Sequence, residues 1–106
     1  MPEFLYRIQP TRPAMLTEGP TPEERETLAA HLAYLERLAT AGVVLLFGRT
    51  QTTDAATFGI VIFRAGSPDE AQQVMMDDPA VRARVMWGEV FPFRVVGVGS
   101  GLATRD

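Results

Sequence analysis

The chain has 106 residues, of which 46% are hydrophobic and 22% charged, a size and composition typical of one globular domain with a modest core. Its net charge of −3 argues against nucleic-acid binding, which usually requires a basic surface, and no apolar run approaches the ~20 residues that span a bilayer. No signal peptide opens the sequence. The absence of cysteine leaves the redox compartment undetermined, so we expect a cytoplasmic protein only by default, with no membrane partner.

The first predicted element is a strand over Glu3–Gln9, where Phe4, Tyr6 and Ile8 alternate with residues that point the other way. Residues 10–20 follow and contain three prolines and a glycine. This composition predicts a loop. A loop of that length in a small domain is often either a lid over a site or a poorly ordered segment.

The second element is an amphipathic helix between Thr21 and Gly42. Thr21 and Glu24 form the pattern of a capping box, and Gly42 suits a left-handed position at the helix end. His31, the single histidine of the chain, falls within the apolar stripe of this helix and is therefore directed toward the core or a cavity in it. The stripe consists of Leu28, Leu32, Leu35, Leu38 and Ala39.

Two strands come next. Residues 43–50 are almost wholly apolar and predict a buried strand, and residues 57–64 are rich in β-branched and aromatic residues. The polar residues 51–56 between them indicate a turn. We expect the two strands to form an antiparallel hairpin.

The last third of the chain repeats the pattern of helix followed by strand. Ser67 begins a helix with the same signals of cap, proline and acids, and Asp78 begins a further helical turn. Residues 87–96 predict a strand, in which Pro92 requires a sheet edge or a bulge because proline donates no backbone hydrogen bond.

The resulting order, β-α-β-β-α-β, predicts an α+β, ferredoxin-like sandwich: an antiparallel sheet with both helices on one face. Residues 1–97 would form this single domain, and residues 98–106 a flexible tail. The other sheet face would expose apolar residues of the second and third strands. A second copy of the chain, in a homodimer, is the simplest cover.

The residue types that are missing restrict the chemistry. Without lysine or cysteine there is no Schiff base, thiol nucleophile or iron–sulfur cluster. Ser67 serves as a helix cap and Ser100 lies among glycines, so no Ser-His-Asp triad is expected, and one histidine without cysteine does not predict a zinc site. The remaining option is acid–base chemistry by His31 and a carboxylate without a cofactor, or no chemistry.

Four strings of the sequence resemble the YCII-related (YciI-like) family over residues 3–97: ETLAAHLAYLERLATAGVVLLFG, SPDEAQQVM, DDPAVRARV and GEVFPFRVV. The resemblance implies the dimeric α/β-barrel form of the ferredoxin-like fold, related to muconolactone isomerase. A few members are lyase- or dehydrochlorinase-like enzymes of aromatic degradation, and most have no assigned substrate. The family's proposed histidine and Asp-Pro aspartate correspond to His31 and Asp78.

The chain departs from the family pattern at two places. Ala80 stands where an aromatic residue is common, and Arg49-Thr50 stands where the segment after Gly48 is usually apolar or proline-like. These changes should alter the shape and polarity of the pocket.

Each candidate has a structural interpretation beside the functional one. His31 could be a core histidine bonded to a carbonyl group. Asp78 could be a simple helix cap, with Asp77 as an alternative partner of the histidine. The candidate substrate-binding residues are Arg12 for an acidic group, and Tyr6, Tyr34 and Trp87 for a flat ring.

We therefore expect a small cofactor-independent enzyme of the isomerase or lyase type. His31 would move a proton on a small cyclic or aromatic substrate, and Asp78 would orient the histidine ring. The alternatives are a non-catalytic module that binds a metabolite or partner through the same pocket, and a cofactor-free or haem-using monooxygenase on the same barrel.

Overall fold

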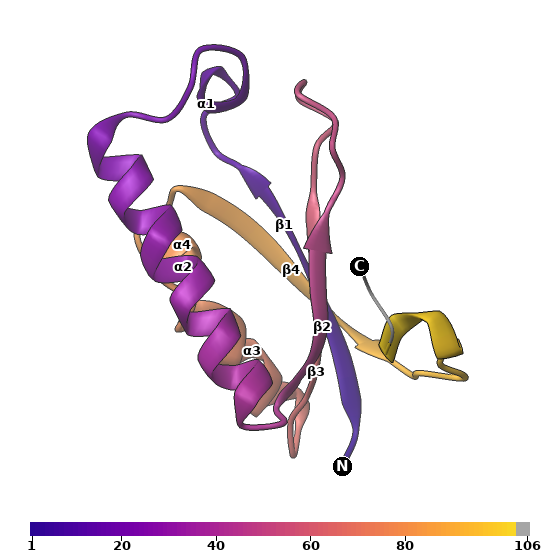
Figure 1. The fold of residues 1–106 in the computed structure, drawn as a ribbon. Coiled ribbons are helices and arrows are strands. Elements are labelled where there is room, and N and C mark those ends of the chain that lie inside the picture. The colour runs from indigo at the N-terminus through magenta and orange to yellow at the C-terminus, as the bar shows by residue number, and fades with distance from the viewer. Residues whose placement is uncertain (104–106) are drawn as a thin grey trace.

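The computed structural model describes residues 1–103, in which helices cover one face of a four-stranded antiparallel sheet (Figure 1). The elements are β1 (Glu3–Pro10), α1 (Ala14–Thr17), α2 (Pro22–Thr40), β2 (Val44–Arg49), β3 (Gly59–Arg64), α3 (Pro68–Met76), α4 (Pro79–Arg82), β4 (Met86–Phe93) and the 3-10 helix η1 (Ser100–Ala103). The strand order is β2-β3-β1-β4, with every pair antiparallel. The predicted ferredoxin-like α+β fold is confirmed.

The ends of α2 are set by local hydrogen bonds, as the sequence predicted. The backbone N–H of Glu24 donates to Thr21 Oγ1 at 3.1 Å, and the Glu24 carboxylate accepts from the backbone N–H of Thr21 at 2.8 Å. Gly42 follows the helix with a φ of +80°, a conformation that costs glycine little. These signals need no tertiary contact, which is why they can be recognised in the sequence.

The two edge strands differ in how well the sequence predicted them. β2 and β3 form the expected antiparallel hairpin, but the prediction that β2 is fully buried is wrong, because only Val44 is buried along it. β2 lies at an edge of the sheet, and its other apolar residues, Leu45, Leu46 and Phe47, are half-buried there. β4 is the opposite edge and carries Pro92, as the lack of a proline N–H requires.

The segment 10–20 contains a helical turn that the sequence analysis did not predict. α1 begins directly after Pro13 and buries Met15 to 5% exposure. The backbone N–H of Thr11 also donates to the carbonyl of Val85 at 3.0 Å. A single turn of four residues is too short to produce a helical periodicity in the sequence, so only its proline content was visible.

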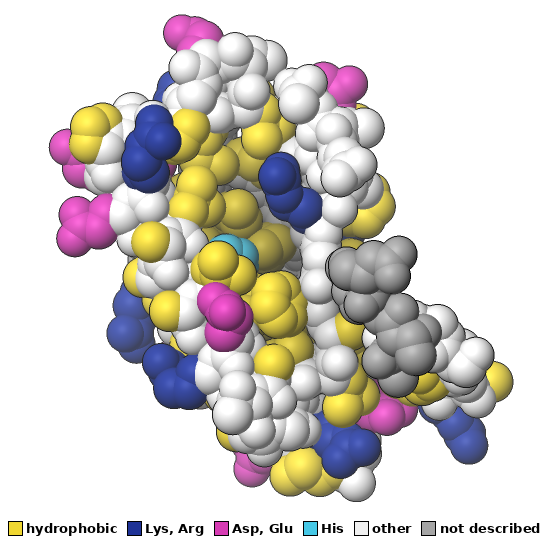
Figure 2. Space-filling model, viewed as in Figure 1, with side chains coloured by type: hydrophobic (Ala, Val, Ile, Leu, Met, Phe, Trp, Pro, Cys, Tyr) yellow, Lys and Arg dark blue, Asp and Glu magenta, His cyan; other side chains and the backbone are white. Residues whose placement is uncertain are grey.

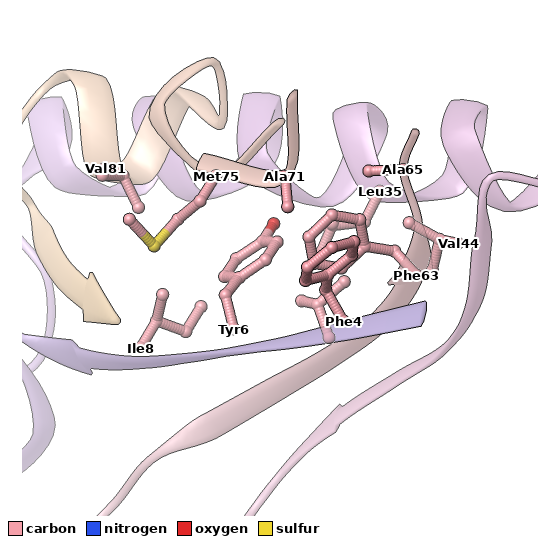
Figure 3. Close-up of a cluster of buried hydrophobic side chains, with 11 residues drawn as sticks. Phe4, Tyr6, Ile8, Leu35, Val44, Phe63, Ala65, Ala71, Met75 and Val81 are labelled. Carbon is pink, nitrogen blue, oxygen red and sulfur yellow. The ribbon is translucent and has the colours of Figure 1, made fainter. Parts of the chain in front are cut away.

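The core lies between the helices and the sheet (Figure 3). Phe4, Tyr6 and Ile8 alternate along β1 and face the helices, and the rings of Tyr6 and Phe63 meet edge to face at 5.5 Å. Figure 3 shows the Tyr6 hydroxyl directed away from β1, toward the helical layer. One polar group is thereby placed inside an otherwise apolar cluster.

The face of the sheet opposite the helices carries an apolar row that crosses all four strands. Cross-strand pairing connects Leu46 with Ile62, Ile62 with Leu5, and Leu5 with Phe91. Paired residues share a sheet face, and Leu5 alternates with the inward-facing Phe4 and Tyr6. In the described part of the chain, no helix is long and apolar enough to cross a membrane.

The chain ends beyond β4 on a short extension. Residues 100–103 of the expected flexible tail (98–106) form η1, whereas its last part, residues 104–106, lies outside the described residues. The backbone N–H of Val95 donates to Glu3 Oε1 at 2.9 Å, which ties the start of the extension to β1.

Candidate active site

The side chains of His31 and Asp78 are in direct contact, 47 residues apart in the sequence. Nδ1 of His31 lies 2.7 Å from Oδ1 and 2.9 Å from Oδ2 of Asp78. His31 lies in the middle of α2, and Asp78 lies at the start of α4, where its Oδ1 also accepts the backbone N–H of Ala80 at 2.9 Å. Asp78 therefore caps a helix and contacts the histidine with the same carboxylate.

A third donor completes the surroundings of this carboxylate. The hydroxyl of Tyr6 donates to Asp78 Oδ2 at 2.8 Å, and Asp78 is 0% exposed. Burying an unpaired carboxylate would cost many kcal/mol, so the hydrogen-bond donors are what make its ionised form tolerable here. Burial and the adjacent Asp78 raise the pKa of Tyr6 above its usual value, so this phenol remains a neutral donor.

The contact also assigns the tautomer of His31. An ionised carboxylate only accepts hydrogen bonds, so Nδ1 of the neutral imidazole carries the hydrogen and Nε2 keeps a free lone pair. The side chain of His31 is 15% exposed and lines a cavity that Asp78 does not reach. The ring edge that carries Nε2 is therefore the edge available to a ligand.

This cavity has a volume of about 610 Å³, which suits a small organic molecule. Its wall is formed by α2, by all four strands, by the segment that contains α1, and by the segment between β2 and β3. Figure 2 shows it as a hollow with hydrophobic side chains around the histidine. Leu32 is 49% exposed although it belongs to the apolar stripe of α2, because it faces this hollow and not the core. The α2 residues of the wall are Leu28, His31, Leu32 and Leu35.

Tyr34 and Arg12 have partners within the protein and do not line the cavity. The Tyr34 hydroxyl donates to the carbonyl of Val74 at 2.7 Å, and burial raises its pKa to about 12. Arg12 Nε donates to Glu24 Oε2 at 2.9 Å, and this pairing lowers the pKa of Glu24 to about 2. Arg12 thus connects the segment 10–20 with the first turn of α2.

Trp87 and Asp77 are also separate from the cavity. Trp87 lies on β4 opposite Gln9, on the sheet face without helices, and is 44% exposed. Asp77 lies 3.3 Å from Arg82 and accepts a hydrogen bond from Gln73, so Asp78 and not its neighbour contacts the histidine. Tyr6 reaches the site through Asp78 and not as part of the cavity wall.

Several wall residues were not candidates in the sequence analysis. Met15 and Leu16 come from α1, and Phe47 and Arg49 from β2. For Arg49 the only signal was its departure from an apolar family position; nothing in its local pattern indicated a cavity. Among residues 1–103, no three histidine or acidic side chains lie close enough together to hold a metal ion.

Comparisons with known proteins agree with this architecture. The profile of the YCII-related domain matches residues 4–94. A solved 5-chloro-2-hydroxyhydroquinone dehydrochlorinase from Burkholderia phenoliruptrix AC1100, in complex with 2,5-dihydroxybenzoquinone, is 26% identical with a TM-score of 0.61, over 86% of this chain and 93% of that one. A muconolactone isomerase has a TM-score of 0.65 at 16% identity, over 92% and 96% of the two chains. No curated protein sequence matches the chain.

Proposed function

The chain belongs to the YCII-related family, and we propose that it is a cofactor-independent acid–base enzyme of the isomerase or lyase type, acting on a small cyclic or aromatic compound. One observation carries this proposal. A histidine whose Nδ1 is held by a fully buried carboxylate at 2.7 Å presents its other ring edge to an apolar cavity of about 610 Å³.

The proposed chemistry follows from the tautomer. Nε2 of His31 removes a proton from a carbon next to a carbonyl group. The electron pair of the broken C–H bond forms a carbon–carbon double bond, and the π pair of the carbonyl moves onto its oxygen to give an enolate. Asp78 stabilises the imidazolium that forms. Return of the proton to another carbon completes an isomerisation, whereas departure of a group from the neighbouring carbon completes an elimination.

The surroundings of His31 suit this reaction. The wall of the cavity is mostly apolar, and an apolar, water-poor site strengthens the interaction between imidazolium and carboxylate. The similarity to a dehydrochlorinase at 26% identity supports small-molecule chemistry of this class, while the similarity to muconolactone isomerase supports the fold.

We also propose that the protein is a homodimer. The apolar row of Leu46, Ile62, Leu5 and Phe91 lies on the sheet face that no helix covers, and Trp87, Phe91 and Phe93 are 44%, 43% and 39% exposed. An apolar surface that crosses a whole sheet is typical of an interface. A second copy presents the same row and is therefore self-complementary to it.

The test is proton exchange, because exchange reports the breaking of a C–H bond whether the overall reaction is an isomerisation or an elimination. Muconolactone, which carries C–H bonds on saturated carbons, is incubated with the protein in D₂O, and deuterium incorporation is followed by NMR. We expect exchange with the native protein and a loss of about 10² to 10⁴-fold in His31→Gln. Equal exchange by both proteins would contradict the role of His31.

The alternative, a non-catalytic binding module, makes a different prediction for the same variant. A module of that kind would bind muconolactone without catalysing exchange, and His31→Gln would change only the affinity. The contact between His31 and the buried carboxylate of Asp78 favours the enzyme, because this carboxylate stabilises the imidazolium that proton transfer produces, whereas binding a neutral ring does not require it.

A further inference from the structure

Arg49 is the basic residue of the cavity wall and is not used by the proposed mechanism. It is the last residue of β2 and pairs with Gly59 on β3. A Cβ atom built on Gly59 would lie 3.3 Å from the Ile8 side chain, which faces the core, so this position of the sheet faces the helices. Since paired residues share a face, Arg49 is directed to the side of the sheet on which the cavity lies.

The described residues of the cavity wall offer basic side chains but no acidic ones. The ionisable side chains among the described wall residues are Arg49 and His31, and the wall contains no aspartate or glutamate. Within residues 1–103, the ion pairs of arginine involve Arg7, Arg12 and Arg82, whereas Arg49 has no carboxylate within 4.0 Å. A guanidinium group without a counter-ion at the edge of an apolar cavity is suited to a ligand that supplies the negative charge.

We propose that Arg49 binds an anionic oxygen pair of the substrate, and that the substrate is a small ring compound with a carboxylate or an equivalent acidic group. This inference rests on the proposed use of the cavity as the substrate site. The apolar wall takes the ring, and the guanidinium forms two parallel hydrogen bonds to the acidic group, a geometry that lysine cannot reproduce. Arg49 is then a specificity-determining residue, distinct from the pair that moves the proton.

In this arrangement, the ring of the substrate and its acidic group contact different residues of the cavity wall. Leu28, Leu32 and Phe47 supply apolar surface from α2 and β2, and three threonines of the segment after β2 also line the cavity: Thr52, Thr53 and Thr57. Of these, Thr57 Oγ1 already donates to the carbonyl of Thr52 at 2.8 Å. The charged contact with a ligand is thus left to the guanidinium group.

The experiment compares benzoate with benzamide, which have the same ring and differ in charge. Each is titrated into the native protein at millimolar concentrations, and binding is followed by the amide NMR signals of cavity residues. We expect benzoate to bind about tenfold more tightly than benzamide, the effect of one charge-assisted hydrogen-bond pair. Arg49→Gln should abolish this preference, and Arg49→Lys should restore only part of it.

The matched control is Arg64→Gln, which removes the same charge from an exposed residue at the opposite end of the hairpin. It should keep the preference of the native protein. Equal affinity of the native protein for the two compounds, no benzoate-induced shifts in cavity residues, or an equal loss in both glutamine variants would each overturn the proposal. Because binding is measured without turnover, His31→Gln should keep the preference even if the proposed acid–base reaction proves wrong.

Discussion

The hydroxyl of Tyr6 donates a 2.8 Å hydrogen bond to Asp78, across 72 residues of sequence. Tyr6 comes from the central part of the sheet and Asp78 from the start of α4, and both are 0% exposed. The same carboxylate holds His31. The orientation of the His31 ring therefore depends on Tyr6, a residue of the core that holds the Asp78 carboxylate, as well as on the helix that carries the histidine.

Tyr6→Phe tests this positioning role. The variant keeps the ring in the core but removes one of the donors to a buried carboxylate, which should lower the free energy of unfolding by about 1–3 kcal/mol. In addition, kcat for proton exchange should fall more than KM changes, because Asp78 orients His31 less firmly. Urea denaturation and exchange kinetics measure the two effects. A stability loss with unchanged kcat would indicate a purely structural tyrosine.

Asp78→Asn removes the negative charge of the site but should leave its fold intact. Asp77→Asn, which removes a neighbouring charge outside the site, is the matched control. The amide oxygen introduced by Asp78→Asn can still accept the N–H of Ala80, so the α4 cap remains, but the neutral side chain no longer stabilises an imidazolium. We expect exchange to fall by about 10² to 10⁴-fold. Asp77 contacts Arg82 at the surface, so Asp77→Asn should exchange like the native protein. Similar rates in the two variants would show that the carboxylate of Asp78 has no role in the chemistry.

Acid should weaken the connection between the segment 10–20 and α2. Arg12 lowers the pKa of Glu24 from 4.5 to about 2, so the folded protein holds this carboxylate ionised more strongly than the unfolded chain does. That contribution to stability is complete above about pH 4.5 and disappears as the pH falls through 2. Urea denaturation at a series of pH values should show a shallower acid decline in Glu24→Gln. An unchanged decline would mean that the pair contributes no pH-dependent stability.

Alkaline titration should show delayed ionisation of both tyrosines. Burial raises the pKa of Tyr34 from 10.0 to about 12, and that of Tyr6 rises as well. Since the folded state keeps these protons, their contribution to stability is present below pH 10 and is lost as the pH rises through the raised pKa values, about 12 for Tyr34. In Tyr6→Phe, the phenolate absorbance of the remaining Tyr34 reports its midpoint directly. A midpoint near 10 in the folded variant would contradict its burial.

The assembly can be tested on the face of the sheet without helices. Light scattering should give a mass twice that of the 11.6 kDa chain. Phe91→Asp places a charge in the apolar row and should produce a monomer that remains folded by circular dichroism. Met76→Asp, at an exposed apolar residue of α3, is the matched control and should leave the mass unchanged. A native protein of 11.6 kDa would refute the dimer.

The sequence by itself determined the elements whose signals are local. Thr21, Glu24 and Gly42 specify the ends of α2 through contacts within a few residues, and alternation in β1 selects its buried face. His31 could be placed on an inward-facing stripe because helical spacing alone decides which side chains share a face. The contact with Asp78 was predictable in outline, from the order of elements and the family resemblance.

Tertiary structure decided which side chains contact one another and which face of the sheet each one occupies, because both depend on strand register and on the neighbours of each strand. Tyr6 was a candidate for the pocket, but its hydroxyl reaches Asp78, which no local pattern could show. Arg12 was a candidate for substrate, yet a glutamate twelve residues later is its partner. Trp87 lies on the outer face because β4 pairs with β1 in the register that places it opposite Gln9. Arg49 faces the cavity because β2 pairs with β3 in the register that places it opposite Gly59. A shift of one residue in pairing reverses every side chain of a strand, and that shift is set by long-range contacts.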